Sequence, residues 1–215
     1  MVFGLKMNRY PHSTMTGDVF ACRNGTRPST ITLFFQRISG EPQSLAAHIG
    51  MMESSDELCH ARQSTGVAIQ TLTEYMDECY MTMPGFEWAV YRCLTLTEAD
   101  RAAIAASLRS YKGTRYAPLE LALCGIDWVI AMITGIERPV ARRLGDLVPW
   151  NMICSKLVGI HINLFGMLPG RHEHDTPDDL VDAIIDSQAW SCVDASDDWD
   201  RQSGPLLVTY SMACA

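Results

Sequence analysis

The sequence predicts an α+β fold, in which an antiparallel sheet packs on helices within a single domain. Short apolar runs between turn residues fill the chain up to residue 92, and helical periodicity with capping residues dominates 97–185. A last apolar run, 205–210, indicates a returning strand. Strands first, helices next and a strand at the end are typical of α+β domains. The 215 residues suffice for one domain with a sizeable core and an insertion.

Five strands are expected in the first part of the chain. Each is a short apolar or alternating run bounded by turn residues such as Gly17, Gly66 and Gly85. The expected ranges are 18–22, 46–52, 58–61, 66–69 and 87–92. A single helical turn is expected at 72–76, before the fifth strand.

A helix is expected to begin after Thr97, a favourable N-cap that acidic residues follow in the first turn, and to end at Gly113. Apolar side chains recur along it at helical spacing, at Ile104, Leu108 and Tyr111. The following segment, 117–149, is expected to be a helical insertion that covers a cleft as a lid. Its apolar part, 119–136, is interrupted by a charge and is short for a membrane span, so no integral membrane segment is expected.

Two more helices are expected after this insertion. The first has Cys154 in its first turn and ends before Pro169, and its apolar stripe faces the core. That stripe contains Ile153, Cys154, Leu157, Val158, His161, Leu164 and Phe165. The second begins at Thr176, where a capping hydroxyl precedes a proline and two acids.

Charge and composition argue against several classes of protein. The formal net charge is -8, and no basic stripe with interleaved aromatic residues offers a track for phosphates, so nucleic acid is not an expected partner. Four acids at 194, 197, 198 and 200 lack the glycine and the terminal glutamate of a calcium loop, and we interpret them as a solvated loop.

The cysteines and the N-terminal residues predict synthesis in a reducing compartment. Eight cysteines are scattered without a Cys-x-x-Cys pair, which indicates reduced, buried thiols. The first fifteen residues contain charged residues and a proline where a signal peptide needs an unbroken apolar run. We therefore expect a chain made in the cytoplasm, and association with a virion or release to a cell wall would need another route.

Cys154 is the candidate nucleophile. A cysteine attacks a carbonyl carbon as its thiolate, which a helix N-terminus or a neighbouring imidazole favours. His161 lies seven residues further along the same helix, about 10 Å along its axis, too far to share a proton. His48 and His60 lie in adjacent expected strands, where side chains approach within about 5 Å, so the pair can hold one imidazole in the tautomer that a base needs.

A series of short motifs surrounds these residues in order over about 16–185. The motifs are Gly17-Asp18-Val19, Ala47-His48-Ile49-Gly50, Cys59-His60-Ala61, Gly66-Val67, Leu72-Thr73-Glu74-Tyr75, Gly113-Thr114-Arg115-Tyr116, Ile153-Cys154-Ser155-Lys156-Leu157-Val158 and Thr176-Pro177-Asp178-Asp179-Leu180. The series resembles the circularly permuted branch of the NlpC/P60 papain-like cysteine hydrolases. In that branch the histidine precedes the nucleophile along the chain.

The resemblance implies a role for four side chains. Cys154 would be the nucleophile, His48 the general base and then acid, and His60 the group that orients His48. Tyr116 would face the substrate or assist the oxyanion hole. The implied reaction cleaves an amide bond, with peptides of bacterial cell-wall material as the leading substrate, and requires no cofactor. Such a substrate suits a bacterial or phage protein.

Two other hypotheses stay open at this stage. Related permuted enzymes act on acyl chains, so a lipid or acyl-ester hydrolase or transferase is the second enzymatic hypothesis. A binding or virion structural module without turnover is the third. A zinc site made from Cys59, His60, His172 and His174 is not expected, because neighbours on a strand point to opposite faces of a sheet.

Overall fold

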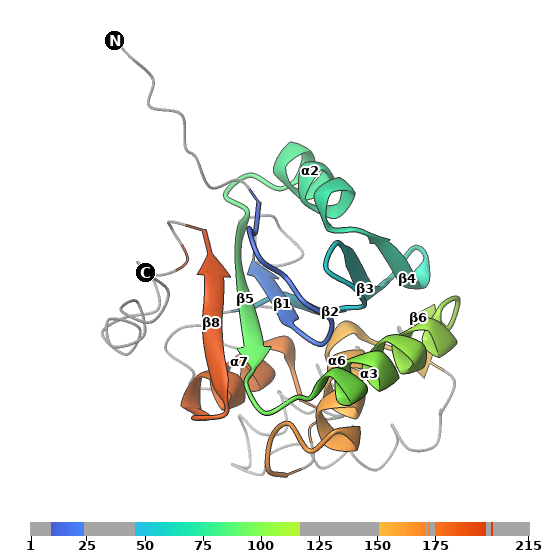
Figure 1. The fold of residues 1–215 in the computed structure, drawn as a ribbon. Helices are drawn as coiled ribbons and strands as arrows, with labels where there is room; N and C mark the ends of the chain where they lie inside the picture. The colour runs from blue at the N-terminus through green and yellow to red at the C-terminus, as the bar shows by residue number, and fades with distance from the viewer. Residues whose placement is uncertain are drawn as a thin grey trace, which may run out of the picture.

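The computed structural model describes residues 10–23, 46–116, 151–170, 172, 175–196 and 199. These residues form a six-stranded antiparallel sheet, a separate two-stranded parallel sheet and four helices (Figure 1). The predicted α+β class is confirmed. None of the described helices is both long enough and apolar enough to cross a lipid bilayer.

The main sheet has the strand order β4-β3-β2-β1-β5-β8. Its strands are β1 (Val19–Arg23), β2 (His48–Met52), β3 (Glu57–Arg62), β4 (Gly66–Thr71), β5 (Glu87–Cys93) and β8 (Trp190–Ala195). The first five occupy the predicted positions to within two residues at each end. The second sheet pairs β6 (Arg115–Tyr116) in parallel with β7 (Asn151–Met152).

Alternation along the strands gives the main sheet two apolar faces. In β1, Val19 and Ala21 belong to one buried cluster, and Phe20 and Cys22 belong to the other. Helix α2 (Leu72–Thr82) packs on the second face through Tyr75. Figure 1 shows α2 on one side of the sheet and α3 (Glu98–Tyr111), α6 (Cys154–Leu164) and α7 (Pro177–Asp186) on the other.

The predicted starts of α3 and α7 are confirmed in detail. The Thr97 hydroxyl accepts a hydrogen bond from the backbone of Asp100, whose carboxylate accepts one from the Thr97 backbone. Thr176 and Asp179 form the same reciprocal arrangement at the start of α7. Each pair satisfies backbone N–H groups that the first turn of a helix leaves open.

Two expectations need correction, and three predicted segments lie outside the described residues. The expected single turn at 72–76 is the beginning of an eleven-residue helix, α2, because Tyr75, Met76 and Cys79 continue its apolar stripe onto the sheet. Asp194 does not lie in a solvated loop: it is half-buried in β8, where its carboxylate accepts a hydrogen bond from the His12 backbone at 2.7 Å. The expected insertion at 117–149, the acids at 197, 198 and 200, and the strand at 205–210 are outside the described residues.

Candidate active site

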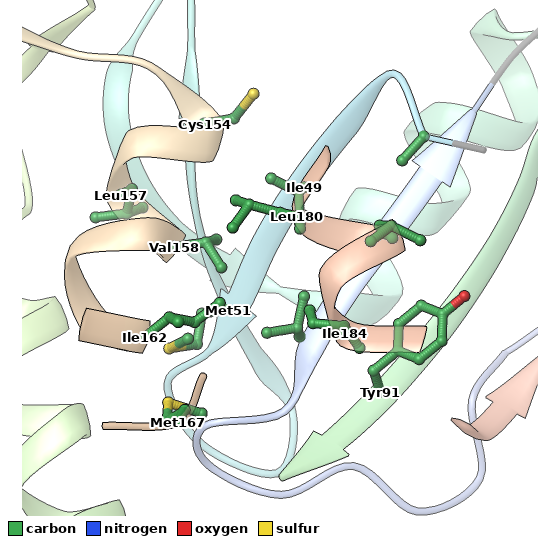
Figure 2. Packing of buried hydrophobic residues seen from close by; sticks show 14 of the residues in the cluster. Ile49, Met51, Tyr91, Cys154, Leu157, Val158, Ile162, Met167, Leu180 and Ile184 are labelled. Carbon is green, nitrogen blue, oxygen red and sulfur yellow. The ribbon is translucent and has the colours of Figure 1, made fainter. Parts of the chain in front are cut away.

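Helix α6 places Cys154 at its first residue, as predicted. The preceding strand β7 is held beside β6, so the backbone of Tyr116 lies alongside the residues that lead into the helix. The Cys154 side chain is 8% exposed. Figure 2 shows its sulfur directed away from Leu157 and Val158, which pack further along α6 against the sheet. The thiol therefore lies at the helix N-terminus, at the margin of the core.

The hydrogen-bonded pairing of β2 with β3 ends near the Cys154 thiol. The paired residues are Met51 with Cys59 and Met52 with Leu58, so His48 and Ile49 extend beyond the ladder. Burial raises the pKa of the Cys154 thiol, and a hydrogen bond from the backbone N–H of Ile49 to the sulfur opposes part of this rise. The end of the ladder thus explains how a sulfur carried by α6 reaches the backbone next to His48.

His48 and His60 are hydrogen-bonded to one another on the face of the sheet that α2 covers, opposite to the face on which Ile49 and Cys154 pack. His48 Nε2 lies 3.3 Å from His60 Nδ1, and the ring planes are nearly perpendicular, at 81°. Cys59 points the other way, with its sulfur 3.9 Å from the carbonyl of Leu108. The expected pairing of the histidines is confirmed, as is the expected separation of Cys59 from His60.

The two imidazoles meet because position 50 has no side chain. A Cβ on Gly50 would lie 3.1 Å from the Cβ of His60 and 3.0 Å from the carbonyl oxygen of Cys59. Such contacts are tighter than ordinary packing and would push His60 away from its present place. A glycine at position 50 therefore allows His48 and His60 to come close together. Its φ is not in the left-handed region, so the backbone conformation does not require glycine.

Two further side chains complete the cluster, and the sequence patterns gave neither of them a role. Gln70 Oε1 lies 3.2 Å from His60 Nε2. The Tyr75 ring packs edge-on against His60, with centroids 4.8 Å apart, and lies 6.2 Å from the His48 ring. Gln70 could have been suspected because it lies on the strand paired with β3, and Tyr75 because it occurs within one of the quoted motifs.

The cluster is electrically neutral in its resting state. Burial, followed by the positive charge of Arg62, lowers the pKa of His60 to about 4. Burial, His60 and Arg62 together lower the pKa of His48 to about 3. Burial raises the pKa of the Cys154 thiol, and this outweighs the lowering by the backbone N–H groups of Ile49, Ser155 and Cys154. At neutral pH the proton therefore resides on sulfur and both imidazoles are uncharged.

The thiol and the imidazole are close in the chain fold but are not hydrogen-bonded to each other. Among the described contacts, the ring of His48 bonds to His60, and the Cys154 sulfur interacts with backbone N–H groups. The structure thus brings His48 and His60 together and sets Cys154 against Ile49, the residue next to His48.

Tyr116 lines a cavity of about 460 Å³ at the edge of the small sheet. The cavity is lined by Gln63, Ser64, Thr65, Gly66, Gly113, Arg115 and Tyr116. Gly66 pairs with Arg62 at the end of β3, so the cavity lies at the same end of the main sheet as His48. Most of the lining residues have polar side chains. The role of Tyr116 toward substrate stays a prediction.

Two other described histidines, His161 and His172, have structural surroundings. His161 is fully buried between the carbonyl of Leu157 at 2.8 Å and the Ser107 hydroxyl at 3.0 Å, which ties α6 to α3. His172 bonds to Asp175 at 2.7 Å. Within the described residues, no three histidine, cysteine, aspartate or glutamate side chains gather as a metal-binding group. His174 lies outside those residues.

No protein-family model matches the chain, and no curated protein matches it significantly. The features that define the site are a thiol at a helix N-terminus and a hydrogen-bonded pair of neutral imidazoles on the adjoining strands.

Proposed function

We propose that this chain is a cysteine hydrolase that cleaves an amide bond, with Cys154 as nucleophile, His48 as general base and His60 as the group that orients His48. The observation that carries the proposal is the His48–His60 hydrogen bond, one residue away from the backbone N–H that acts on the Cys154 sulfur. The order His48, His60, Cys154 is that of a circularly permuted papain-like enzyme, and geometry, not chain order, determines such a site.

The reaction begins with transfer of the thiol proton to His48 as the sulfur attacks the carbonyl carbon. The resulting oxyanion is stabilised by the Cys154 backbone N–H at the positive end of α6, with Tyr116 as a further donor. Collapse breaks the C–N bond, and His48 returns its proton to the leaving amine. Water, deprotonated by His48, then cleaves the thioester, which releases a carboxylic acid and restores the thiol.

The neutral resting state favours general-base catalysis over a preformed thiolate. Because the Cys154 sulfur is protonated and the His48 imidazole is uncharged, the thiol proton moves to His48 as the bond between sulfur and the carbonyl carbon forms. General-base assistance of this kind is worth about 10²- to 10⁴-fold in rate. Catalytic hydrogen bonds are often long in a free enzyme and tighten when substrate binds, which fits the separate sulfur and imidazole.

Selective reactivity of Cys154 tests the proposal directly. Alkylation with iodoacetamide, followed by peptide mapping in a mass spectrometer, gives the labelling rate of each cysteine in the same sample. Cys154 should react faster than Cys59, which is buried and has a pKa raised to about 12. His48→Ala should slow the labelling of Cys154 at least about tenfold, since the base is lost.

The opposite result would identify a binding or structural module. Labelling of Cys154 that is as slow as that of Cys59, or that does not depend on His48 in a variant that keeps the native circular dichroism spectrum, contradicts the proposal. Substrate class is tested with the same variants. Release of amine from cell-wall muropeptides, absent in Cys154→Ala, supports the amidase, whereas release from acyl esters alone would favour the lipid-directed reaction.

A further inference from the structure

Gln70 is the last member of a chain of hydrogen bonds that starts at His48. The chain runs from His48 Nε2 to His60 Nδ1 at 3.3 Å, and from His60 Nε2 to Gln70 Oε1 at 3.2 Å. We infer that Gln70 is a positioning residue that fixes the tautomers of both histidines and so leaves His48 Nδ1 unprotonated. This inference rests on the proposed function, because it explains why His48 can accept the thiol proton.

The direction of the chain follows from the donors and acceptors available. An amide oxygen only accepts, so His60 Nε2 must carry the proton that it shares with Gln70. A neutral imidazole has one N–H, so His60 Nδ1 has a lone pair and accepts from His48 Nε2. His48 then has its proton on Nε2 and a lone pair on Nδ1, and Nδ1 is the basic atom that the proposed transfer from the Cys154 thiol requires.

The reverse orientation of the amide would abolish the base. If the Gln70 amide nitrogen faced His60, it would donate to Nε2, and the His60 proton would move to Nδ1. His60 would then donate to His48 Nε2, and His48 would carry its proton on Nδ1, where no thiol proton could be accepted. A side chain that only filled space beside His60 would leave both tautomers free to exchange.

Gln70 can fix the tautomer of His48 through His60 only if both imidazole rings are uncharged, because an imidazolium carries a proton on each nitrogen. The ionisable groups around His60 are His48 on β2, Arg62 on β3, and Tyr75 and Glu78 on α2. Arg62 is bound to Glu78 at 2.8 Å and lies over the Tyr75 ring. The nearby guanidinium, together with burial, opposes a proton on His60, so a single N–H per ring is maintained at neutral pH.

Two substitutions separate tautomer control from packing. Gln70→Leu has a similar size but no acceptor, and should lower the labelling rate of Cys154 and kcat by about tenfold with little change in KM. Gln70→Glu keeps an acceptor but adds a negative charge, which raises the pKa of His60. Above that pKa the rate should be near that of the parent protein.

Below that pKa, His60 in Gln70→Glu becomes an imidazolium that donates from Nδ1, and His48 is forced into the wrong tautomer. The acid limb of the rate profile should therefore move to higher pH in Gln70→Glu. A packing role predicts the same loss at every pH. Gln188→Leu, at an exposed glutamine in the turn before β8, is the matched control and should leave the profile unchanged.

Imidazole ¹⁵N spectra of histidine-labelled protein report the tautomers without any turnover. His48 should show a protonated Nε2 and an unprotonated Nδ1, and Gln70→Leu should mix the two forms. A proton on His48 Nδ1 in the parent protein, or unchanged tautomers and rates in Gln70→Leu, overturns the inference. If His48→Ala slows Cys154 labelling while Gln70→Leu does not, the hydrolase proposal stands and only the inference fails; if neither matters, the hydrolase proposal itself fails.

Discussion

At the scale of single residues, the candidate site depends on how closely two strands can bring their side chains together. His60 is fully buried, yet its ring has a polar partner at each nitrogen, in His48 and Gln70. A buried polar group without partners would be costly, so these bonds help to offset the burial of the ring. The same bonds that stabilise the cluster also set the direction of the His48 lone pair.

Gly50→Ala should disturb this cluster more than it disturbs the fold. The added methyl group would meet the Leu58 side chain at 3.0 Å and the Cβ of His60 at 3.1 Å. Overpacking of this kind costs about 1–3 kcal/mol, and His60 would move away from His48. We expect slower labelling of Cys154, measured by peptide mapping, and a lower urea midpoint.

Gly85→Ala is the control for this substitution. A methyl group there meets nothing within 4 Å, although the residue has a φ of +73° that strains an alanine. We expect some loss of stability with unchanged labelling of Cys154. Equal labelling in Gly50→Ala and the parent protein would show that the spacing of His48 and His60 does not affect the thiol.

At the scale of helices and strands, local sequence fixed the helix starts, whereas contacts with the sheet fixed one helix length. The reciprocal bonds of Thr97 with Asp100 involve residues three apart, so they form wherever this sequence becomes helical. The second turn of α2 has no such local determinant. It continues because Met76 and Cys79 are buried in the apolar cluster on this face of the sheet, which also contains Phe20.

Thr97→Ala should destabilise the protein by about 1 kcal/mol, since the N-cap oxygen that accepts from Asp100 is lost. Thr97→Ser retains that oxygen and should recover most of the loss. Urea unfolding at neutral pH, followed by circular dichroism, measures both. If the serine variant were as unstable as the alanine variant, the methyl group of Thr97, and not its hydroxyl, would be the stabilising feature.

At the scale of the whole molecule, the sheet separates two apolar layers, and buried histidines occur in both. His48 and His60 lie with α2 on one face, and His161 lies between α6 and α3 on the other. Burial lowers the pKa of all three. Below about pH 6.5, these three histidines therefore bind fewer protons in the folded protein than in the unfolded chain.

Stability should accordingly fall as the solution is acidified. A histidine whose folded pKa is lowered contributes its full share above the ordinary value of 6.5, and this share is lost as pH falls toward about 4 for His60. His60→Gln should flatten the dependence of unfolding free energy on pH between 6.5 and 4, by up to about 1.4 kcal/mol per pH unit. Urea titrations at several pH values measure this slope.

Asp182 provides a comparison of opposite sign. Its side chain is exposed at the surface, but partial desolvation and the neighbouring aspartates Asp178, Asp179 and Asp186 raise its pKa to about 7. It therefore binds a proton more tightly in the folded protein and favours folding at lower pH. Asp182→Asn should therefore steepen the fall in unfolding free energy on acidification, whereas His60→Gln should reduce it. A slope unchanged by His60→Gln would mean that His60 is not the group that resists protonation.

The sequence by itself determined the features that depend on neighbouring residues. Five of the six strands of the main sheet, the capped starts of α3 and α7, and the place of Cys154 at the first turn of α6 followed from alternation, helical spacing and capping chemistry. The pairing of His48 with His60 could also be expected, because consecutive strands commonly lie side by side.

Only the tertiary structure decided the features that depend on partners distant in the chain. Strand β8 was missed because its mixed sequence, including Asp194, becomes a strand through pairing with β5. Likewise, Ile49 meets the Cys154 sulfur where the β2–β3 ladder ends, and Gln70 reaches His60 from a neighbouring strand. Periodicity shows which face a side chain occupies but not where two strands separate, since that separation arises from packing of the whole sheet against its helices.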